Sequence, residues 1–229
     1  MVRLFHDRRH AGMLLAAALE KHVQQPGVVI LALPRGGVPV AYEVARHLEA
    51  PMDVFLVRKL GVPWHEEYAM GAIASGGVIV LNEDVVRALG IPPEEVADVA
   101  RAEERELKRR EDAYRDSRQR VDVTGKTVIL IDDGLATGST MRAAIQALRR
   151  LNPARVIAAV PIAAADTCAD MADEADEMVC AVTPEPFVAV GLWYQDFTQT
   201  TDEEVRELLA AADRAHEERQ QEVLRVHET

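Results

Sequence analysis

A short apolar run that ends in two adjacent acids constrains the fold of this chain more than any other feature. The apolar residues Val128–Ile131 predict a buried parallel strand, and Asp132 and Asp133 follow it directly. Ala136–Thr140 then leads into a segment whose apolar residues recur at helical spacing. Free backbone N–H groups and the positive end of the helix dipole make such a helix start a seat for a phosphate group.

The two carboxylates beside this seat add a second chemical capability. Their oxygens can accept hydrogen bonds from neighbouring sugar hydroxyls, and they can help to hold Mg²⁺, which prefers oxygen ligands. Diol and phosphate recognition together indicate a ligand of the ribose 5-phosphate type. A generic α/β loop with an acidic helix cap stays open as the alternative. A P-loop is excluded because its Gly-x-x-x-x-Gly-Lys-Ser/Thr pattern is missing from the sequence.

The stretch Asp132–Thr140 resembles the phosphoribosyl pyrophosphate (PRPP) motif of the type I phosphoribosyltransferases, and its Ala-Thr-Gly is most similar to the adenine and uracil enzymes. The resemblance implies transfer of the 5-phosphoribosyl group from Mg²⁺-PRPP to a nitrogen nucleophile, with release of pyrophosphate. It implies that Asp132 and Asp133 are catalytic, holding the ribose hydroxyls and, directly or indirectly, the metal. The implied 5-phosphate ligands are Ala136, Thr137, Gly138, Ser139 and Thr140.

Two basic segments also follow predicted strands. Leu33–Gly37 resembles the family's pyrophosphate loop, which implies binding by Arg35, Gly36 and Gly37. That loop often contains a non-proline cis peptide, which would fall between Pro34 and Arg35. The pair Arg58 and Lys59 resembles the basic pair before the flexible loop of the adenine and orotate enzymes, which also implies pyrophosphate binding. An ordinary strand-to-helix turn and a solvated basic rim are the respective alternatives.

The polar segment after the basic pair lies where the family has its mobile lid. We expect Gly61–Tyr68 to be a loop because it is polar and contains a proline, and Ala69–Leu81 to form a β-hairpin around two glycines. Closure of a lid would exclude water from the reaction. Glu66 and His65 are the candidate catalytic acid/base groups there, although a surface position is the alternative for His65.

The segment Phe187–Phe197 holds four of the ten aromatic residues of the chain. It is similar to a segment of the 6-oxopurine enzymes in which an aromatic ring stacks on the base, so Phe187 and Trp193 are the implied stacking residues. Burial of the same side chains in a core or subunit contact is an equally weighted alternative.

Strands that alternate with helices predict an α/β fold, with a twisted parallel sheet flanked by helices. The resemblance adds a small hood and a hairpin/helix insertion. We expect one domain over residues 1–229, with its core at about 25–60 and 121–182. The loop, hairpin and long helix would occupy about 61–120, and the hood and C-terminal helix about 183–229. Expected strands are 27–33, 52–57, 128–131, 155–160 and 177–181, and expected helices are 7–24, 38–48, 164–172 and 202 onward.

The long helix expected over Pro93–Ser117 has a narrow apolar seam that contains Val96, Leu107 and Tyr114. We expect this seam to pair with a second copy, because so narrow a stripe buries little surface in its own domain. Type I enzymes are commonly dimers, so a homodimer is predicted.

Composition excludes several functions. A formal net charge of −12 argues against general nucleic-acid binding, which requires a basic face. We expect no membrane span and no signal peptide, and therefore a cytoplasmic protein. Cys168 and Cys180 fit neither a zinc spacing nor a disulfide framework, so both are expected to be reduced. The alternative function is a non-catalytic PRPP- or nucleotide-binding regulator on the same fold.

Overall fold

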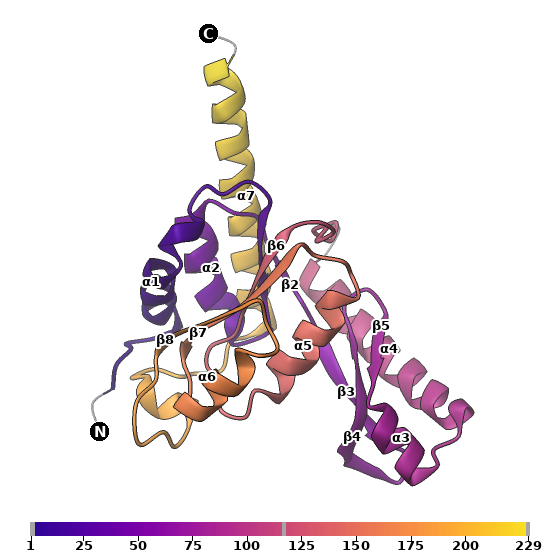
Figure 1. The fold of residues 1–229 in the computed structure, drawn as a ribbon. Coiled ribbons are helices and arrows are strands. Elements are labelled where there is room, and N and C mark those ends of the chain that lie inside the picture. Colours follow the sequence, from indigo (N-terminus) through magenta and orange to yellow (C-terminus); the bar gives the residue numbers. More distant parts are fainter. Residues whose placement is uncertain (1–2, 116–117, 228–229) are drawn as a thin grey trace.

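A parallel sheet forms the centre of the molecule, as expected where apolar strands alternate with helices. The computed structural model describes residues 3–115 and 118–227. Five parallel strands lie in the order β2-β1-β6-β7-β8 (Figure 1), which confirms the predicted α/β class. Their bounds are β1 (Val28–Ala32), β2 (Met52–Val54), β6 (Thr127–Ile131), β7 (Arg155–Ile162) and β8 (Glu177–Val182).

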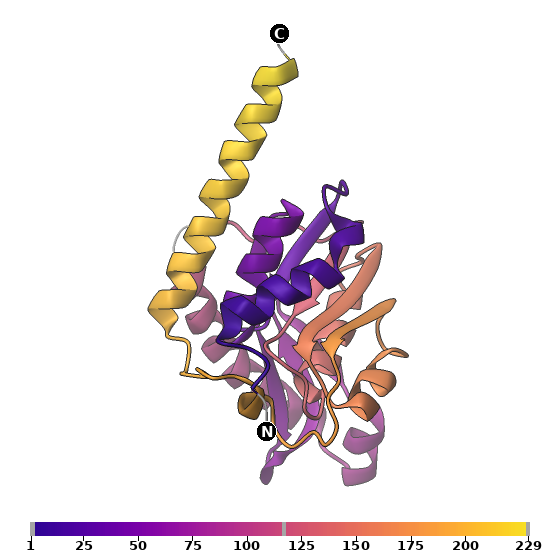
Figure 2. The same cartoon turned by 90° about the vertical axis from the view of Figure 1, so that its left-hand side faces the viewer.

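Helices cover both faces of this sheet because alternate strand residues point to opposite sides. In β1, Ile30 packs in the same core cluster as residues of α1, α2 and α7, whereas Leu31 packs with residues of α5 and α6. Figure 2 shows α7 running beside α2 and projecting beyond the body. The helices are α1 (Arg8–Ala18), a 3-10 turn η1 (Glu20–His22), α2 (Gly37–Leu48), α5 (Ser139–Arg149), α6 (Ala165–Met171) and α7 (Asp202–His227).

A second, antiparallel sheet forms a separate lobe in the order β3-β4-β5, together with two helices. The hairpin expected around Gly76 and Gly77 is present between β4 and β5. The loop expected over Gly61–Tyr68 is wrong, because β3 and β4 continue as a ribbon and turn only at Pro63–Trp64. The elements are β3 (Val57–Val62), β4 (His65–Ala74), β5 (Val78–Leu81), α3 (Glu83–Leu89) and α4 (Pro93–Arg115).

The apolar seam of α4 is buried within its own chain. Val96, Leu107 and Tyr114 belong to the cluster that contains Leu60 and Met70 of the β3–β4 ribbon. The premise that this seam lacks an intramolecular partner is therefore wrong, because the ribbon covers it. The homodimer prediction loses that support, and Ser117, where the helix was expected to end, lies outside the described residues.

The segment between β8 and α7 folds back over the core as a hood. Its 3-10 turn η2 (Val190–Trp193) is tied to the start of the chain, since the amides of Leu4 and Phe5 both donate to the Trp193 carbonyl at 3.0 Å. The Thr201 hydroxyl then accepts from the Glu204 amide and so caps the first turn of α7. Neither α7 nor any other helix in the described ranges is long and apolar enough to span a membrane.

The two cysteines correct a prediction. Cys168 of α6 and Cys180 of β8 form a disulfide, with their Cα atoms 6.6 Å apart. The fold brings α6 against β8, and this places the two side chains within bridging distance. A sequence separation of 12 residues matches no motif, so the pairing was invisible before the topology was known.

Candidate functional site

The predicted ligand-binding loops meet at the point where the strand order of the sheet reverses. β1 lies between β2 and β6, so the chain runs in opposite directions across the sheet on its two sides. Ala32 ends β1 and is the register partner of Ile131, which ends β6. Such a switch point, beyond the carboxyl ends of the strands, is where open α/β sheets bind ligands.

The loop after β1 lies directly against the acid pair. A Cβ atom added to Gly36 would lie 2.0 Å from the Asp133 Oδ2 atom, and one added to Gly37 would lie 2.6 Å from the Ile131 carbonyl oxygen. Only glycine fits at either position without displacing the acid pair or the strand end. The peptide between Pro34 and Arg35 is cis, as the resemblance implied.

Arg8, at the start of α1, is a member of this site that the sequence did not reveal. Its Nε atom donates to Asp133 Oδ2 at 2.8 Å, and both side chains are largely buried, at 11% and 16% exposure. Its guanidinium carbon lies 3.9 Å above the centre of the Phe197 ring, and Nη1 donates to the Thr198 carbonyl at 2.7 Å. Arg8 therefore joins the first helix, the hood and the acid pair.

Burial raises the pKa of both carboxylic acids. Loss of water raises the pKa of Asp132 well above its usual 3.8, and the charge of Asp133 adds to this effect. Desolvation also raises the pKa of Asp133, but the Arg8 guanidinium opposes the shift. Asp133 is consequently the more readily ionised of the two. Hydroxyl donors on a ligand would replace the hydrogen bonds that water no longer supplies.

The loop Ala136–Thr140 has the geometry of the predicted phosphate seat. Gly138 is the N-cap of α5 with a φ of 71°, and no side chain at that position caps the helix. The Thr137 and Ser139 hydroxyls lie 2.8 Å apart, and Thr167 of α6 donates to the Ala136 carbonyl. Because Thr137, Ser139 and Thr140 are exposed, the first turn of α5 is open to an anion.

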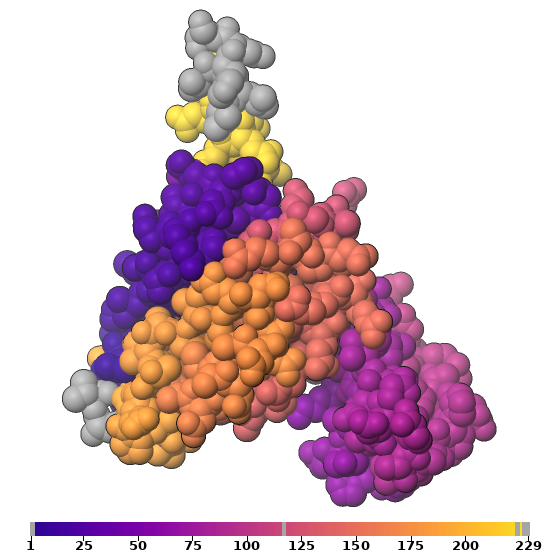
Figure 3. Space-filling model, viewed as in Figure 1, coloured from indigo at the N-terminus to yellow at the C-terminus, as the bar shows by residue number. Residues whose placement is uncertain are grey.

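The two residues of the basic pair point to opposite faces of the β3–β4 ribbon. Arg58 forms ion pairs with Glu103 and Glu106 of α4. Lys59 instead faces α5 and lines a cleft of about 490 Å³ that also contains Ser139 and Arg142. None of the described residues that line this cleft is acidic. Figure 3 shows the surface hollowed between the core and the magenta lobe. Lys59, not Arg58, is the member of the pair brought toward the phosphate seat.

Arg35 is less free than its place in the loop suggested. Its Nη1 atom lies 3.6 Å from Asp202 Oδ1 at the start of α7, and its side chain is 35% exposed. Tyr114 of α4 donates to the same carboxylate oxygen at 3.1 Å. Arg35, which was predicted to bind pyrophosphate, is thus paired with an acid at the start of α7.

The predicted acid/base groups lie far from the acid pair. His65 and Glu66 are both exposed near the tip of the β3–β4 ribbon, which reaches away from the parallel sheet (Figure 1). Ala72 of β4 lies opposite Lys59, and His65 lies seven residues before Ala72 in the same strand. His65 is therefore roughly 20 Å from the position of Lys59 along the ribbon. The structure therefore does not bring them together with the acid pair.

The hood covers the acid pair with aliphatic and aromatic groups. Val190 packs on Gly134, where an added Cβ would lie 2.4 Å from Val190 Cγ1. The Tyr194 hydroxyl donates to the Asp133 carbonyl at 2.6 Å, and burial raises the pKa of this phenol, which keeps it protonated. Trp193 is only 7% exposed and packs with Phe187 in a hood core, as the alternative reading of this segment described.

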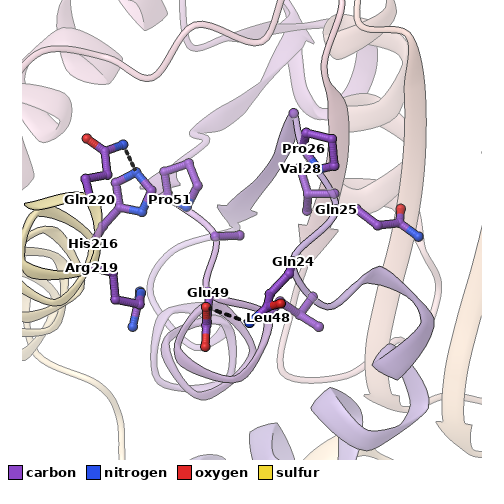
Figure 4. Close-up of a pocket in the computed structure, with 12 residues that line it drawn as sticks. Gln24, Gln25, Pro26, Val28, Leu48, Glu49, Pro51, His216, Arg219 and Gln220 are labelled. Carbon is purple, nitrogen blue, oxygen red and sulfur yellow. Dashed lines mark hydrogen bonds between the residues drawn. The ribbon is translucent and has the colours of Figure 1, made fainter. Parts of the chain in front are cut away.

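A larger cavity, of about 650 Å³, lies at the opposite edge of the sheet. It opens near the start of β1, between residues 24–28 and α7 (Figure 4). Figure 4 shows His216 hydrogen-bonded to Gln220, and Glu49 hydrogen-bonded to Gln24. None of the predicted site residues lines this cavity. Ligands in open α/β sheets bind beyond the carboxyl ends of strands, so the acid-pair edge remains the candidate site.

Known proteins have sequences and folds similar to those of this chain. A family model described as a phosphoribosyl transferase domain matches residues 64–193. Over 215 residues the chain is 48% identical to two Mycobacterium tuberculosis proteins, from strains CDC 1551 and H37Rv, that are provisionally named phosphoribosyl transferases. The match covers 94% of this chain and 48% of each relative, so the chain spans about half their length.

A solved crystal structure is also similar to this chain in both sequence and fold. A Thermus thermophilus protein is 41% identical to this chain, with a TM-score of 0.81, over 91% of this chain and 98% of that protein. The chain therefore belongs to the type I phosphoribosyltransferase family.

Proposed function

We propose that the protein binds Mg²⁺-PRPP and transfers its 5-phosphoribosyl group to a nitrogen nucleophile, with release of pyrophosphate. The observation that carries this proposal is the contact between the acid pair and the loop Leu33–Gly37 at the strand switch point. A ribose held by the carboxylates would have its anomeric carbon beside that loop. Its 5-phosphate would reach the open first turn of α5.

In this proposal each group acts on a different part of the ligand. Asp132 and Asp133 accept hydrogen bonds from the ribose hydroxyls and stabilise the positive charge that develops on the sugar. The backbone of Gly36 and Gly37, with Arg35 and Lys59, receives the negative charge of the departing pyrophosphate. Mg²⁺ arrives as part of the substrate, bound to the oxygens of PRPP. Such preorganised electrostatics commonly supply the largest part of the rate enhancement.

The acceptor is proposed to be a nucleobase other than a 6-oxopurine. In the 6-oxopurine enzymes of this family, an Asp that can interact with purine N7 occupies the position of Ala136. The methyl group of Ala136 can neither donate nor accept a proton. Glu66 and His65 remain the proposed acid/base groups, and they could act only if the ribbon bent toward the acid pair.

The test is pyrophosphate release from Mg²⁺-PRPP across a panel of nucleobases, with an acceptor-free reaction as the blank for hydrolysis. We expect release with adenine or a non-purine base, and less than about 1 s⁻¹ with hypoxanthine, guanine or xanthine, below ordinary enzyme rates. The Asp132→Asn/Asp133→Asn variant should release none. PRPP binding without release for any base would favour the alternative, a non-catalytic regulator.

A homodimer remains a proposal that rests on family resemblance alone. The α4 seam no longer supports it, because that seam is covered by the chain's own ribbon. The proposed partners are PRPP and a small nitrogenous acceptor, without nucleic acid or membrane. Sedimentation at micromolar concentration should show a dimer, and a monomer there would contradict this proposal.

A further inference from the structure

Arg8 places a positive charge directly against one carboxylate oxygen of Asp133. Its guanidinium contacts Asp133 Oδ2 at 2.8 Å, and the pair is largely shielded from water. On the neighbouring acid, Asp132 Oδ1 already accepts from the Asp133 amide at 2.9 Å. One oxygen of each carboxylate is thus engaged within the protein.

These contacts do not fit direct coordination of Mg²⁺ by the acid pair. Mg²⁺ requires near-octahedral oxygen ligands at short distance and repels a cation placed against one of them. Within the ranges that the structure describes, no group of three or more His, Cys, Asp or Glu side chains could hold a metal ion. An uncharged hydroxyl, in contrast, needs only one free carboxylate oxygen and is not repelled by Arg8.

Arg8 is held in this position by three independent contacts. The Phe197 ring lies under its guanidinium at 3.9 Å, the Thr198 carbonyl accepts from Nη1, and Asp133 accepts from Nε. A planar guanidinium that satisfies all three is fixed more rigidly than a lysine ammonium would be. An Arg fixed against the acid pair in this way is part of the site and not a mobile surface charge.

We infer that Arg8 is a specificity-determining positioning residue, which makes the acid pair a receptor for the neutral diol of a ribose and excludes a divalent cation from it. The inference rests on the proposed ribose-binding role of Asp132 and Asp133. The metal of the substrate would then be held by PRPP oxygens and not by the acid pair.

Removal of the Arg8 charge should convert the acid pair into a cation site. We would titrate Mn²⁺, without PRPP, into wild type and Arg8→Gln, and follow free Mn²⁺ by electron paramagnetic resonance. Because an unpaired buried carboxylate recruits a counter-charge, we expect Arg8→Gln to bind Mn²⁺ at least about tenfold more tightly than wild type. Arg8→Lys, which keeps the charge, should behave as wild type, and Arg8→Gln/Asp133→Asn should lose the gain.

The inference is overturned if folded Arg8→Gln, checked by circular dichroism, binds Mn²⁺ no better than wild type. It is also overturned if wild type binds Mn²⁺ at a site that Asp133→Asn abolishes. A second measurement needs no variant: ribose 5-phosphate should bind wild type equally with and without millimolar Mg²⁺, and a change of about tenfold would contradict the inference. Failure of the proposed activity would appear only in pyrophosphate release, which the Mn²⁺ titrations do not use.

Discussion

The carboxyl edge of the parallel sheet and the β3–β4 ribbon differ in how firmly they hold the side chains proposed to act on the ligand. At the sheet edge, Asp133 is contacted by Arg8, lies against Gly36, and has its carbonyl bound by Tyr194. At the ribbon tip, His65 and Glu66 are exposed to solvent. The side chains at the sheet edge are held in place by protein contacts, whereas those at the tip of the β3–β4 ribbon are exposed on a projecting element.

We infer from this difference that the sheet edge and the ribbon would contribute to different steps, binding and turnover respectively. Groups fixed in advance contribute most to binding and to stabilisation of charge, because they need no reorganisation when the ligand arrives. Groups on a projecting element contribute only after that element closes over the ligand, so they affect turnover more than affinity. The predictions that follow test whether the sheet edge controls binding and the ribbon controls turnover.

The largest effect is expected from Gly36→Ala. Its Cβ would lie 2.0 Å from Asp133 Oδ2, so the carboxylate must move, and misplacement of about 1 Å can cost about 100-fold in rate. We expect kcat/KM to fall by at least about 100-fold, together with loss of PRPP affinity in calorimetry. The control is Gly12→Ala, which crowds the α1–α2 contact and should lower thermal stability while the folded fraction binds PRPP normally.

Glu66→Gln should separate turnover from affinity. A lost general base reduces kcat by about 100-fold or more, and the affinity for Mg²⁺-PRPP should not change. Stopped-flow or steady-state assays beside calorimetry would measure both quantities. A fall in PRPP affinity as large as that in kcat would show that the ribbon tip contributes to binding. It would contradict the assignment of binding to the sheet edge alone.

Lys59 and its neighbour Arg58 provide a matched pair within the ribbon. Lys59→Ala should raise KM for Mg²⁺-PRPP by about tenfold, the usual cost of one charge-assisted hydrogen bond. Arg58→Ala should leave KM nearly unchanged, because that guanidinium is paired with Glu103 and Glu106 on the α4 side. Equal effects of the two substitutions in steady-state assays would contradict the assignment of opposite faces.

The smallest effect is expected on stability. Burial raises the pKa of Asp132, so its protonated form is favoured in the folded state, and stability is lost as pH rises through the raised pKa. Asp132→Asn cannot ionise and should match wild type at acidic pH. From about pH 4 upward it should become progressively more stable than wild type. Urea unfolding at several pH values measures this difference, and a variant less stable than wild type at neutral pH would contradict it.

The parts of the site that could be predicted from sequence are those encoded within one short segment. The acid pair follows β6 directly, and the predicted phosphate seat and the Pro34–Arg35 loop lie within a few residues of a strand end, so their position at the sheet edge follows from the strands alone. The α/β fold class could also be predicted, because the hydrophobic periodicity that distinguishes a helix from a strand lies within each element.

What could not be predicted depends on contacts between distant segments. Arg8 meets Asp133 across 125 positions, and no pattern in the first helix distinguishes it from the adjacent Arg9. The β3–β4 ribbon was misjudged because its polar outer residues suggest a loop until α4 is known to cover the other face. The disulfide likewise depends on the packing of α6 against β8.

Calorimetric titration of Mg²⁺-PRPP into wild type and Asp132→Asn/Asp133→Asn tests the central claim most directly. Each lost charge-assisted hydrogen bond costs about 1.5 kcal/mol or more, so we expect the double variant to bind at least about 100-fold more weakly. Circular dichroism establishes that both proteins are folded. Equal affinity in the two proteins would show that the acid pair does not hold the ribose.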